Sequence, residues 1–155
     1  MKPLFHVVLF QPEIPDNTGA IGRTCVGVGA KLWLVRPLGF QIDSRRIKRA
    51  GLDYWEYLDV EVVNCWVDLT QRLAKKRFWF MSKKVETVYT DVQFASDDVF
   101  VFGCETKGLP NQMMQENSTK SLKIPISPNA RCLNLSVSVG IMVFEAKRQI
   151  ALQQK

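Results

Sequence analysis

Apolar positions along the chain follow two spacings, one typical of strands and one typical of helices. Short apolar runs predict strands over residues 4–10, 31–35, 60–63, 77–81, 99–102 and 122–126. Apolar residues three and four positions apart predict helices over residues 18–28, 44–49, 66–75, 112–116 and 133–153. Because strands alternate with helices, we expect an α/β fold with a mostly parallel sheet flanked by helices. The chain contains no linker or repeat, so residues 1–155 are expected to form a single domain.

The last predicted helix has a wider apolar surface than contact with one sheet requires. One face carries Leu135, Val139, Met142, Ala146 and Ile150, and a second line beside it carries Val137, Ile141 and Phe144. Two interpretations remain open at this point. The helix is either deeply buried in the core, or it also forms the contact of a homodimer.

Charge and cysteine content narrow the class of protein. A net charge of +6 and a pI near 9.3 suit an anionic partner such as RNA, although many basic proteins bind no nucleic acid. The four cysteines are widely spaced and form no C-x-x-C pair, so we expect free thiols, no metal site and a cytoplasmic protein. The first ten residues predict a strand rather than a signal peptide, and no segment is long enough to span a membrane.

A loop rich in proline and polar residues follows the first predicted strand. Residues 11–19 have the sequence QPEIPDNTG, in which Asp16 or Asn17 is expected to cap the next helix. Open α/β sheets bind ligands beside the carboxyl ends of their strands, where this loop lies. Arg23 follows inside the helix. Taken alone, the loop is equally consistent with a binding site and with a simple turn.

Four cations follow the second predicted strand within five residues: Arg45, Arg46, Lys48 and Arg49. A short helix capped by Asp43 or Ser44 would place Arg45 and Arg49 on one face. Such a cluster can bind phosphates, and the nearby aromatic residues Tyr54, Trp55 and Tyr57 can stack on unpaired bases. A charge run of this kind is more often only a solvated surface, so it suggests RNA without specifying it.

Two further loops follow predicted strands. Residues 102–110, FGCETKGLP, contain Gly103 and Gly108, which permit tight turns and close approach of a ligand. This pattern is neither a dinucleotide-binding glycine motif nor a Walker loop. Residues 124–136, IPISPNARCLNLS, lead into the last helix, which Asn134 or Ser136 can cap. From the residues alone, the conclusion is an α/β domain with a ligand site built from three loops.

Some mechanisms fit the sequence poorly. His6, the only histidine, lies in the first predicted strand, where a packed side chain is expected. Mechanisms that need a Ser-His, Cys-His or His-metal arrangement are therefore weak. The second strand ends in Val35-Arg36-Pro37, without the acidic residue that a Rossmann-type nucleotide site would have there.

Four segments, taken in order, resemble one known family. They are LFQPEIPDNTGAIGRTC, LVRPLGFQIDSRRIKRAGLDYWEY, FVFGCETKGLP and IPISPNARCLNLSVSVGIMVFEAKRQ. They resemble the small, stand-alone SPOUT methyltransferases, and most closely the tRNA wobble-nucleotide (cytidine/uridine) 2′-O-methyltransferases. The resemblance covers nearly the whole chain.

The resemblance implies a C-terminal trefoil knot, a feature so rare that sequence physics alone would not predict it. It implies S-adenosyl-L-methionine bound in the knot, and a homodimer formed through the last helix with each site near the subunit interface. The implied RNA partner is the anticodon stem-loop of tRNA. The cofactor would contact Met81, Gly103, Glu105, Gly108, Ile124, Cys132 and Leu133.

The resemblance also implies catalytic and RNA-binding roles. Arg23 matches the family's functional arginine, but a guanidinium is hardly ever deprotonated, so it is a poor general base. We expect Arg23 to bind the adjacent phosphate and to stabilise the developing alkoxide. Asn17, Glu105 and Asn134 would hold this arrangement, and Arg45, Arg46, Lys48 and Arg49 would join Arg23 in holding the RNA.

Several positions depart from the common family pattern: Arg36, Cys104, Cys132, Val137 and Lys147. Two alternative functions are also open. The same fold could act on another tRNA or rRNA position, or the chain could be a non-catalytic RNA-binding module. Failure to bind S-adenosylmethionine would favour the module.

Overall fold

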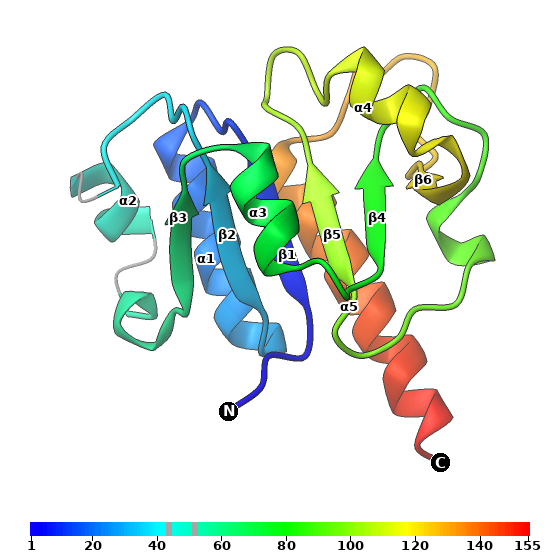
Figure 1. The fold of residues 1–155 in the computed structure, drawn as a ribbon, viewed down its shortest axis with the longest axis horizontal. Helices are drawn as coiled ribbons and strands as arrows, with labels where there is room; N and C mark the ends of the chain where they lie inside the picture. The colour runs from blue at the N-terminus through cyan, green and yellow to red at the C-terminus, as the bar shows by residue number, and fades with distance from the viewer. Residues whose placement is uncertain (43–44, 51–52) are drawn as a thin grey trace.

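Six parallel strands form one sheet in the order β3-β2-β1-β5-β4-β6 (Figure 1). The computed structural model describes residues 1–42, 45–50 and 53–155, without the side chains of Lys48 and Ala50. The strands are β1 (His6–Phe10), β2 (Lys31–Val35), β3 (Val60–Val63), β4 (Phe78–Met81), β5 (Val99–Phe102) and β6 (Ser121–Leu122).

Helices connect the strands and cover both faces of the sheet. The α-helices are α1 (Pro15–Val28), α2 (Arg45–Ala50), α3 (Trp66–Arg72), α4 (Asn111–Glu116) and α5 (Leu135–Gln153). The short 3-10 helices are η1 (Trp55–Tyr57), η2 (Tyr89–Asp91) and η3 (Ser118–Lys120). Figure 1 shows α1 and α5 behind the sheet, α3 in front of it, and α4 beside the carboxyl ends of β4 and β5. The expected α/β architecture is therefore confirmed.

Side chains alternate between the two faces of the sheet, and both faces are buried. Val7 and Leu9 of β1 pack in one core cluster with residues of α1 and α5, whereas Val8 packs in a second cluster with Leu69 of α3. Successive strand residues point to opposite faces, so a strand covered on both sides needs an uninterrupted apolar run. This requirement explains the sequences VVLF in β1 and VFVF in β5.

The two predicted lines of the last helix have different environments. Val139, Met142, Ala146 and Ile150 are buried in the core, with Leu135 partly buried against it. Val137 and Phe144 remain 48% and 53% exposed. The helix is thus a core helix along one line, and the other line is free to contact a second molecule.

Several predicted element boundaries need correction. β1 begins at His6 rather than residue 4, α3 ends at Arg72 rather than residue 75, and α5 begins at Leu135 rather than residue 133. Two larger differences involve prolines. The strand expected over residues 122–126 is only Ser121–Leu122, because the proline at 125 cannot donate a ladder hydrogen bond. The first helix begins at Pro15 rather than residue 18, because proline is favoured in the first turn of a helix. Residue 44, the predicted start of the second helix, lies outside the described residues, as do the predicted caps at 43 and 44.

None of the described helices is long and apolar enough to cross a membrane.

Candidate functional site

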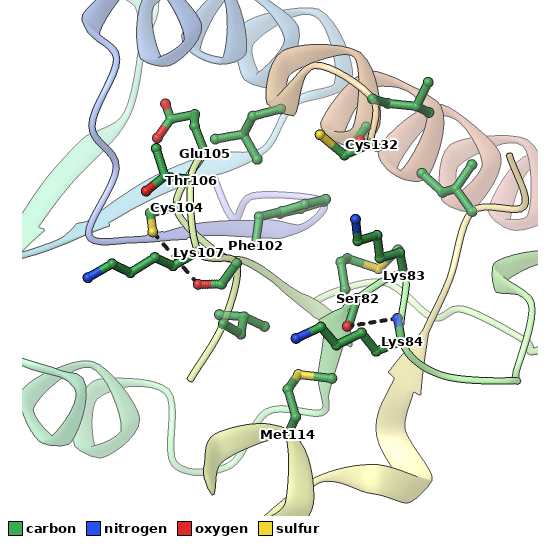
Figure 2. Close-up of a pocket in the computed structure, with 18 of the residues that line it drawn as sticks. Ser82, Lys83, Lys84, Phe102, Cys104, Glu105, Thr106, Lys107, Met114 and Cys132 are labelled. Carbon is green, nitrogen blue, oxygen red and sulfur yellow. Dashed lines mark hydrogen bonds between the residues drawn. The ribbon is translucent and has the colours of Figure 1, made fainter. Parts of the chain in front are cut away.

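A cavity of about 820 Å³ opens at the carboxyl ends of β4, β5 and β6, where loops from distant parts of the chain meet. Its walls include the beginning of α1, the residues after β4, the loop after β5, helix α4, and the segment between β6 and α5. Figure 2 shows part of this lining, with the loop after β5 and the end of β4 on different sides. The position agrees with the rule that open parallel sheets bind ligands beside the carboxyl ends of their strands.

Nine of the predicted site residues line this single cavity. They are the cofactor candidates Met81, Gly103, Glu105, Gly108, Ile124, Cys132 and Leu133, and the two polar candidates Asn17 and Asn134. The chain thus brings together residues from three of the four segments quoted above, together with Met81 at the end of β4. Their roles remain predictions.

Glu105 joins the first loop to the loop after β5. Its carboxylate accepts hydrogen bonds from the backbone N–H groups of Glu13 at 2.8 Å and Ile14 at 3.0 Å. The amide of Asn17 donates to the same carboxylate at 3.4 Å. Because three donors converge on one anion, Glu105 fixes the start of α1 against the cavity.

Asn17 continues this network to the last helix. The Nδ2 group of Asn134 donates to Oδ1 of Asn17 at 3.0 Å, while Oδ1 of Asn134 accepts from the backbone N–H of Ser136 at 2.9 Å. Asn134 therefore both caps α5 and positions its neighbour. The prediction that Asp16 or Asn17 caps α1 is wrong, because Ile14 is the N-cap residue and no side chain caps the helix. The side chain of Asn17 lines the cavity instead.

A second contact ties the same two loops. The hydroxyl of Thr106 donates to the carboxylate of Glu13 at 2.6 Å. Hydrogen bonds with Thr106 and then with Cys104 lower the pKa of Glu13 below its ordinary value. Glu13 therefore remains a carboxylate over the physiological pH range and keeps accepting this hydrogen bond.

Gly103 is required by the backbone of its own loop. A Cβ atom at this position would lie 2.1 Å from the carbonyl carbon of Gly108 and 2.3 Å from the nitrogen of Leu109. Gly108 itself has a φ of +68°, in the left-handed region that glycine adopts readily. The two glycines thus let the chain close a narrow loop along the cavity wall.

Three lysines of the lining were missed by the sequence analysis. Lys83 and Lys84 follow β4, and Lys107 lies in the loop after β5. The ammonium group of Lys83 donates to the backbone carbonyl of Arg131 at 2.7 Å and so links two walls of the cavity. Lys83 and Lys84 come two and three residues after the end of a predicted strand, so their position near its carboxyl end was a usable signal.

Arg23 does not line the cavity. Its guanidinium stacks over the ring of Tyr54, 4.7 Å from the centroid, and lies 3.9 Å from the carboxylate of Asp53. Asn17 and Arg23 are six positions apart on α1, and six steps of about 100° turn a side chain well away from its starting direction. One chain therefore cannot direct both side chains to the same wall.

The basic helix α2 also lies outside the cavity lining. Arg45, Arg46 and Arg49 are exposed, and Arg46 forms an ion pair of 3.2 Å with Asp16 of α1. The side chain of Lys48 lies outside the described part of the chain. Arg23, Arg45, Arg46 and Arg49 are thus exposed cations that lie outside the cavity lining.

His6 is packed, as expected, and lies at the opposite end of the sheet from the cavity. Nε1–H of Trp33 donates to its Nδ1 at 3.0 Å, and its Nε2 lies 3.0 Å from the carboxylate of Asp97. Since Nδ1 accepts a hydrogen bond, the ring is neutral and Nε2 carries the proton. His6 thus has a structural role.

Comparison with known proteins agrees with this description over most of the chain. A relative from Methylovorus glucosotrophus (strain SIP3-4), named tRNA (cytidine(34)-2'-O)-methyltransferase, is 42% identical over 147 residues, which are 94% of this chain and 96% of the relative. A solved structure described as "Structural insights into the 2-OH methylation of C/U34 on tRNA" has a TM-score of 0.90 and 38% identity, with 97% of each chain covered.

More distant structures share the fold. The AdoMet-bound rRNA methyltransferase from Sinorhizobium meliloti has a TM-score of 0.84 and 26% identity, covering 96% of this chain and 57% of that one. The model of the SpoU rRNA Methylase family matches residues 4–144, nearly the full length described above. This chain belongs to the SpoU rRNA Methylase family.

Proposed function

We propose that this chain is an enzyme that transfers a methyl group from S-adenosylmethionine to the 2′-hydroxyl of cytidine or uridine at the wobble position, 34, of tRNA. The observation that carries this proposal is the cavity, whose walls come largely from the segments on which the resemblance rests. The full-length similarity to a tRNA (cytidine(34)-2'-O)-methyltransferase supports the same substrate.

The cavity fits S-adenosylmethionine in size and chemistry. Its volume of about 820 Å³ lies within the range of about 300–1,000 Å³ common for small-molecule sites. Apolar side chains suited to an adenine ring line part of it, including Phe102, Met114, Ile124 and Leu133. The AdoMet-bound Sinorhizobium meliloti enzyme supports this choice of cofactor. When bound, S-adenosylmethionine supplies the methyl group that is transferred.

The polar wall of the cavity has a positioning role in this proposal. Glu105, Asn17 and Asn134 hydrogen-bond to one another or to neighbouring backbone, so each fixes the others. Rigid positioning of a hydroxyl and a reactive group supplies a large share of the rate of such transfers. These three side chains hold the first loop and α5 at a constant distance while RNA binds.

The exposed cations bind RNA. Arg45, Arg46 and Arg49 lie on α2, which packs against α1, and Arg23 lies on the same side with Tyr54. Contacts of this kind with phosphates fix the position of the RNA without reading its sequence. Because Arg23 lies outside the cavity of its own chain, a catalytic role for it requires either a second chain or a movement of this arginine when RNA binds.

The proposal includes a homodimer formed through α5. The exposed side chains of Val137 and Phe144 support it, since burial of apolar surface drives association. It also includes a C-terminal trefoil knot, a single domain and a cytoplasmic location. The knot is supported by family membership.

A methyl-transfer assay with defined RNA tests the function. Purified protein is incubated with tritiated S-adenosylmethionine and anticodon stem-loops that carry either ribose or 2′-deoxyribose at position 34. We expect incorporation only with ribose at position 34. Equal incorporation into both RNAs would move the target to another nucleotide of the stem-loop. RNA binding without any transfer would favour a non-catalytic module.

A further inference from the structure

The cavity carries an excess of positive charge. Its lining contains three lysines, Lys83, Lys84 and Lys107, and among the described lining residues Glu105 is the only carboxylate. The oxygens of Glu105 already accept hydrogen bonds from two backbone N–H groups and from Asn17. The carboxylate of Glu105 therefore offers little negative charge to balance the three lysines.

The three lysines differ in their partners. Lys83 donates to the carbonyl of Arg131, and the charge of Lys107 contributes to the lowered pKa of Glu13. For Lys84 the described contact is made by its backbone N–H, which donates to the hydroxyl of Ser82 at 3.2 Å. Within the described part of the chain, no carboxylate forms an ion pair with the ammonium group of Lys84.

The direction of the Lys84 side chain separates it from the other two lysines. Figure 2 shows Lys84 extending from the end of β4 toward Met114 of α4, while Lys107 points away from that region and Lys83 points toward Cys132. Met114, Gln115 and Ser118 line the cavity on the same side. The network of Glu105 and Asn17 forms a different wall.

We propose that Lys84 binds the α-carboxylate of the methionine part of S-adenosylmethionine, a role that rests on the function proposed above. The sulfonium and the α-ammonium of this ligand are cations, and a lysine-rich cavity disfavours both. Its carboxylate is the one group that a lysine attracts. Pairing at Lys84 places the amino-acid end of the ligand between β4 and α4.

Calorimetric titration with two ligands tests this role. S-adenosylhomocysteine contains the carboxylate and is not consumed, whereas 5′-methylthioadenosine lacks the entire amino-acid part. We expect Lys84→Met to weaken binding of S-adenosylhomocysteine by about threefold to fivefold, the range of a partly exposed ion pair, and to leave methylthioadenosine binding unchanged. Lys84→Arg should restore most of the lost affinity. Lys75→Met, at an exposed lysine that does not line the cavity, is the matched control and should change neither.

Each other outcome contradicts the proposal in a distinct way. Equal weakening of both ligands would mean that Lys84 only maintains the shape of the cavity. Unchanged binding of both ligands together with weaker tRNA binding would make Lys84 a phosphate contact instead. If the wild-type protein binds neither ligand, with or without tRNA, the proposed function fails as well. Binding of both ligands with no effect of Lys84→Met would overturn only the role of Lys84.

Discussion

Glu105 is the residue on which most of the site's geometry depends. Its two oxygens face backbone N–H groups of consecutive residues, Glu13 and Ile14, and one of them also accepts from Asn17. An acceptor with two oxygens is needed here, because both facing groups are donors. The residue type is therefore set by the backbone of the first loop as much as by the ligand.

Replacing Glu105 with Gln should disrupt this loop. The new amide presents an NH2 group to one of the two backbone N–H donors, so one hydrogen bond is lost and two donors oppose each other. We expect the free energy of unfolding to fall by about 1–2 kcal/mol. Methyl transfer should fall by about 10²-fold, as expected when reacting groups are misplaced by about 1 Å.

Urea unfolding and the tritium assay measure the two effects. Glu86→Gln is the control, because the side chain of Glu86 is 100% exposed. If Glu105→Gln and the control behave alike in both measurements, the proposed importance of this carboxylate is wrong.

His6 should make stability depend on pH near neutrality. Burial lowers its pKa below the ordinary value of about 6.5, although the hydrogen bond to Asp97 opposes this change. The unfolded chain therefore takes up a proton as the pH falls through about 6.5, while the folded chain does not, and the folded state loses stability. His6 is the only histidine, so few other side chains titrate in this range.

Thermal unfolding at pH 5.5 and pH 7.5 checks this expectation. The wild type should be less stable at pH 5.5, and His6→Asn should show a smaller difference between the two pH values. A difference that survives the substitution unchanged would assign the pH dependence to other groups.

Asp97 contributes to stability in a lower pH range. Burial favours a higher pKa for its carboxyl, but hydrogen bonds with Lys76, Lys2 and His6 lower that pKa to about 2. The stability that Asp97 contributes is therefore lost only as the pH falls toward that value.

At the scale of elements, the loop after β5 is shaped by close contact within its own backbone. Gly103→Ala should prevent the loop from closing, because the added Cβ would overlap the backbone of Gly108 and Leu109. We expect S-adenosylhomocysteine binding to fall by more than about tenfold, since a displaced wall loses several contacts at once. Calorimetry measures the change.

Gly27→Ala provides the contrasting substitution for that experiment. Gly27 lies in α1, and a Cβ there meets nothing within 4 Å. Alanine is favoured over glycine in a helix by about 1 kcal/mol, so this variant should be at least as stable as the wild type and bind the ligand normally. Loss of binding in both variants would show that the loss at Gly103 does not come from the close backbone contact there.

The sequence predicted most elements of this fold because their signals are local. The runs at residues 31–35, 60–63 and 99–102 match β2, β3 and β5 residue for residue. The signal is strongest in β5, since a strand buried on both faces needs continuous apolar sequence. The end of β6 and the start of α1 were misplaced, because prolines at 125 and 15 change the backbone without changing the apolar pattern.

The site was only partly predictable, because its geometry depends on distant residues. The loop motifs identified Asn17, Glu105 and Asn134, but no periodicity reveals that Asn134 would donate to a residue 117 positions earlier. Motif order likewise placed Arg23 with Asn17, whereas the turn of α1 separates them. Lys84 was missed because a pair of lysines after a strand resembles any solvated charge.

At the scale of the whole molecule, α5 has one apolar line that the single chain does not bury. Phe144 is 53% exposed on this line. Phe144→Glu should weaken the proposed dimer without unfolding the chain, because the core line of the same helix is unchanged. Sedimentation velocity over a range of concentrations should show a lower apparent mass for the variant than for the wild type.

The control for that experiment is Val67→Glu on α3, which packs on the other face of the sheet. Val67 is 60% exposed, so the two substitutions place the same charge at similarly exposed apolar sites. An equal effect of both would indicate non-specific association, and no effect of either would contradict a dimer through α5.

The position of β1 in the sheet has a consequence for how the protein is made. Residue 6 pairs on one side with residue 31 and on the other side with residue 99, so the central strand receives its second neighbour only after nearly two-thirds of the chain. A nascent chain that has not reached β5 presents an apolar strand with one open edge, which can pair with other chains. Until β5 has been synthesised and can pair with β1, this open edge makes the growing polypeptide prone to association with its neighbours.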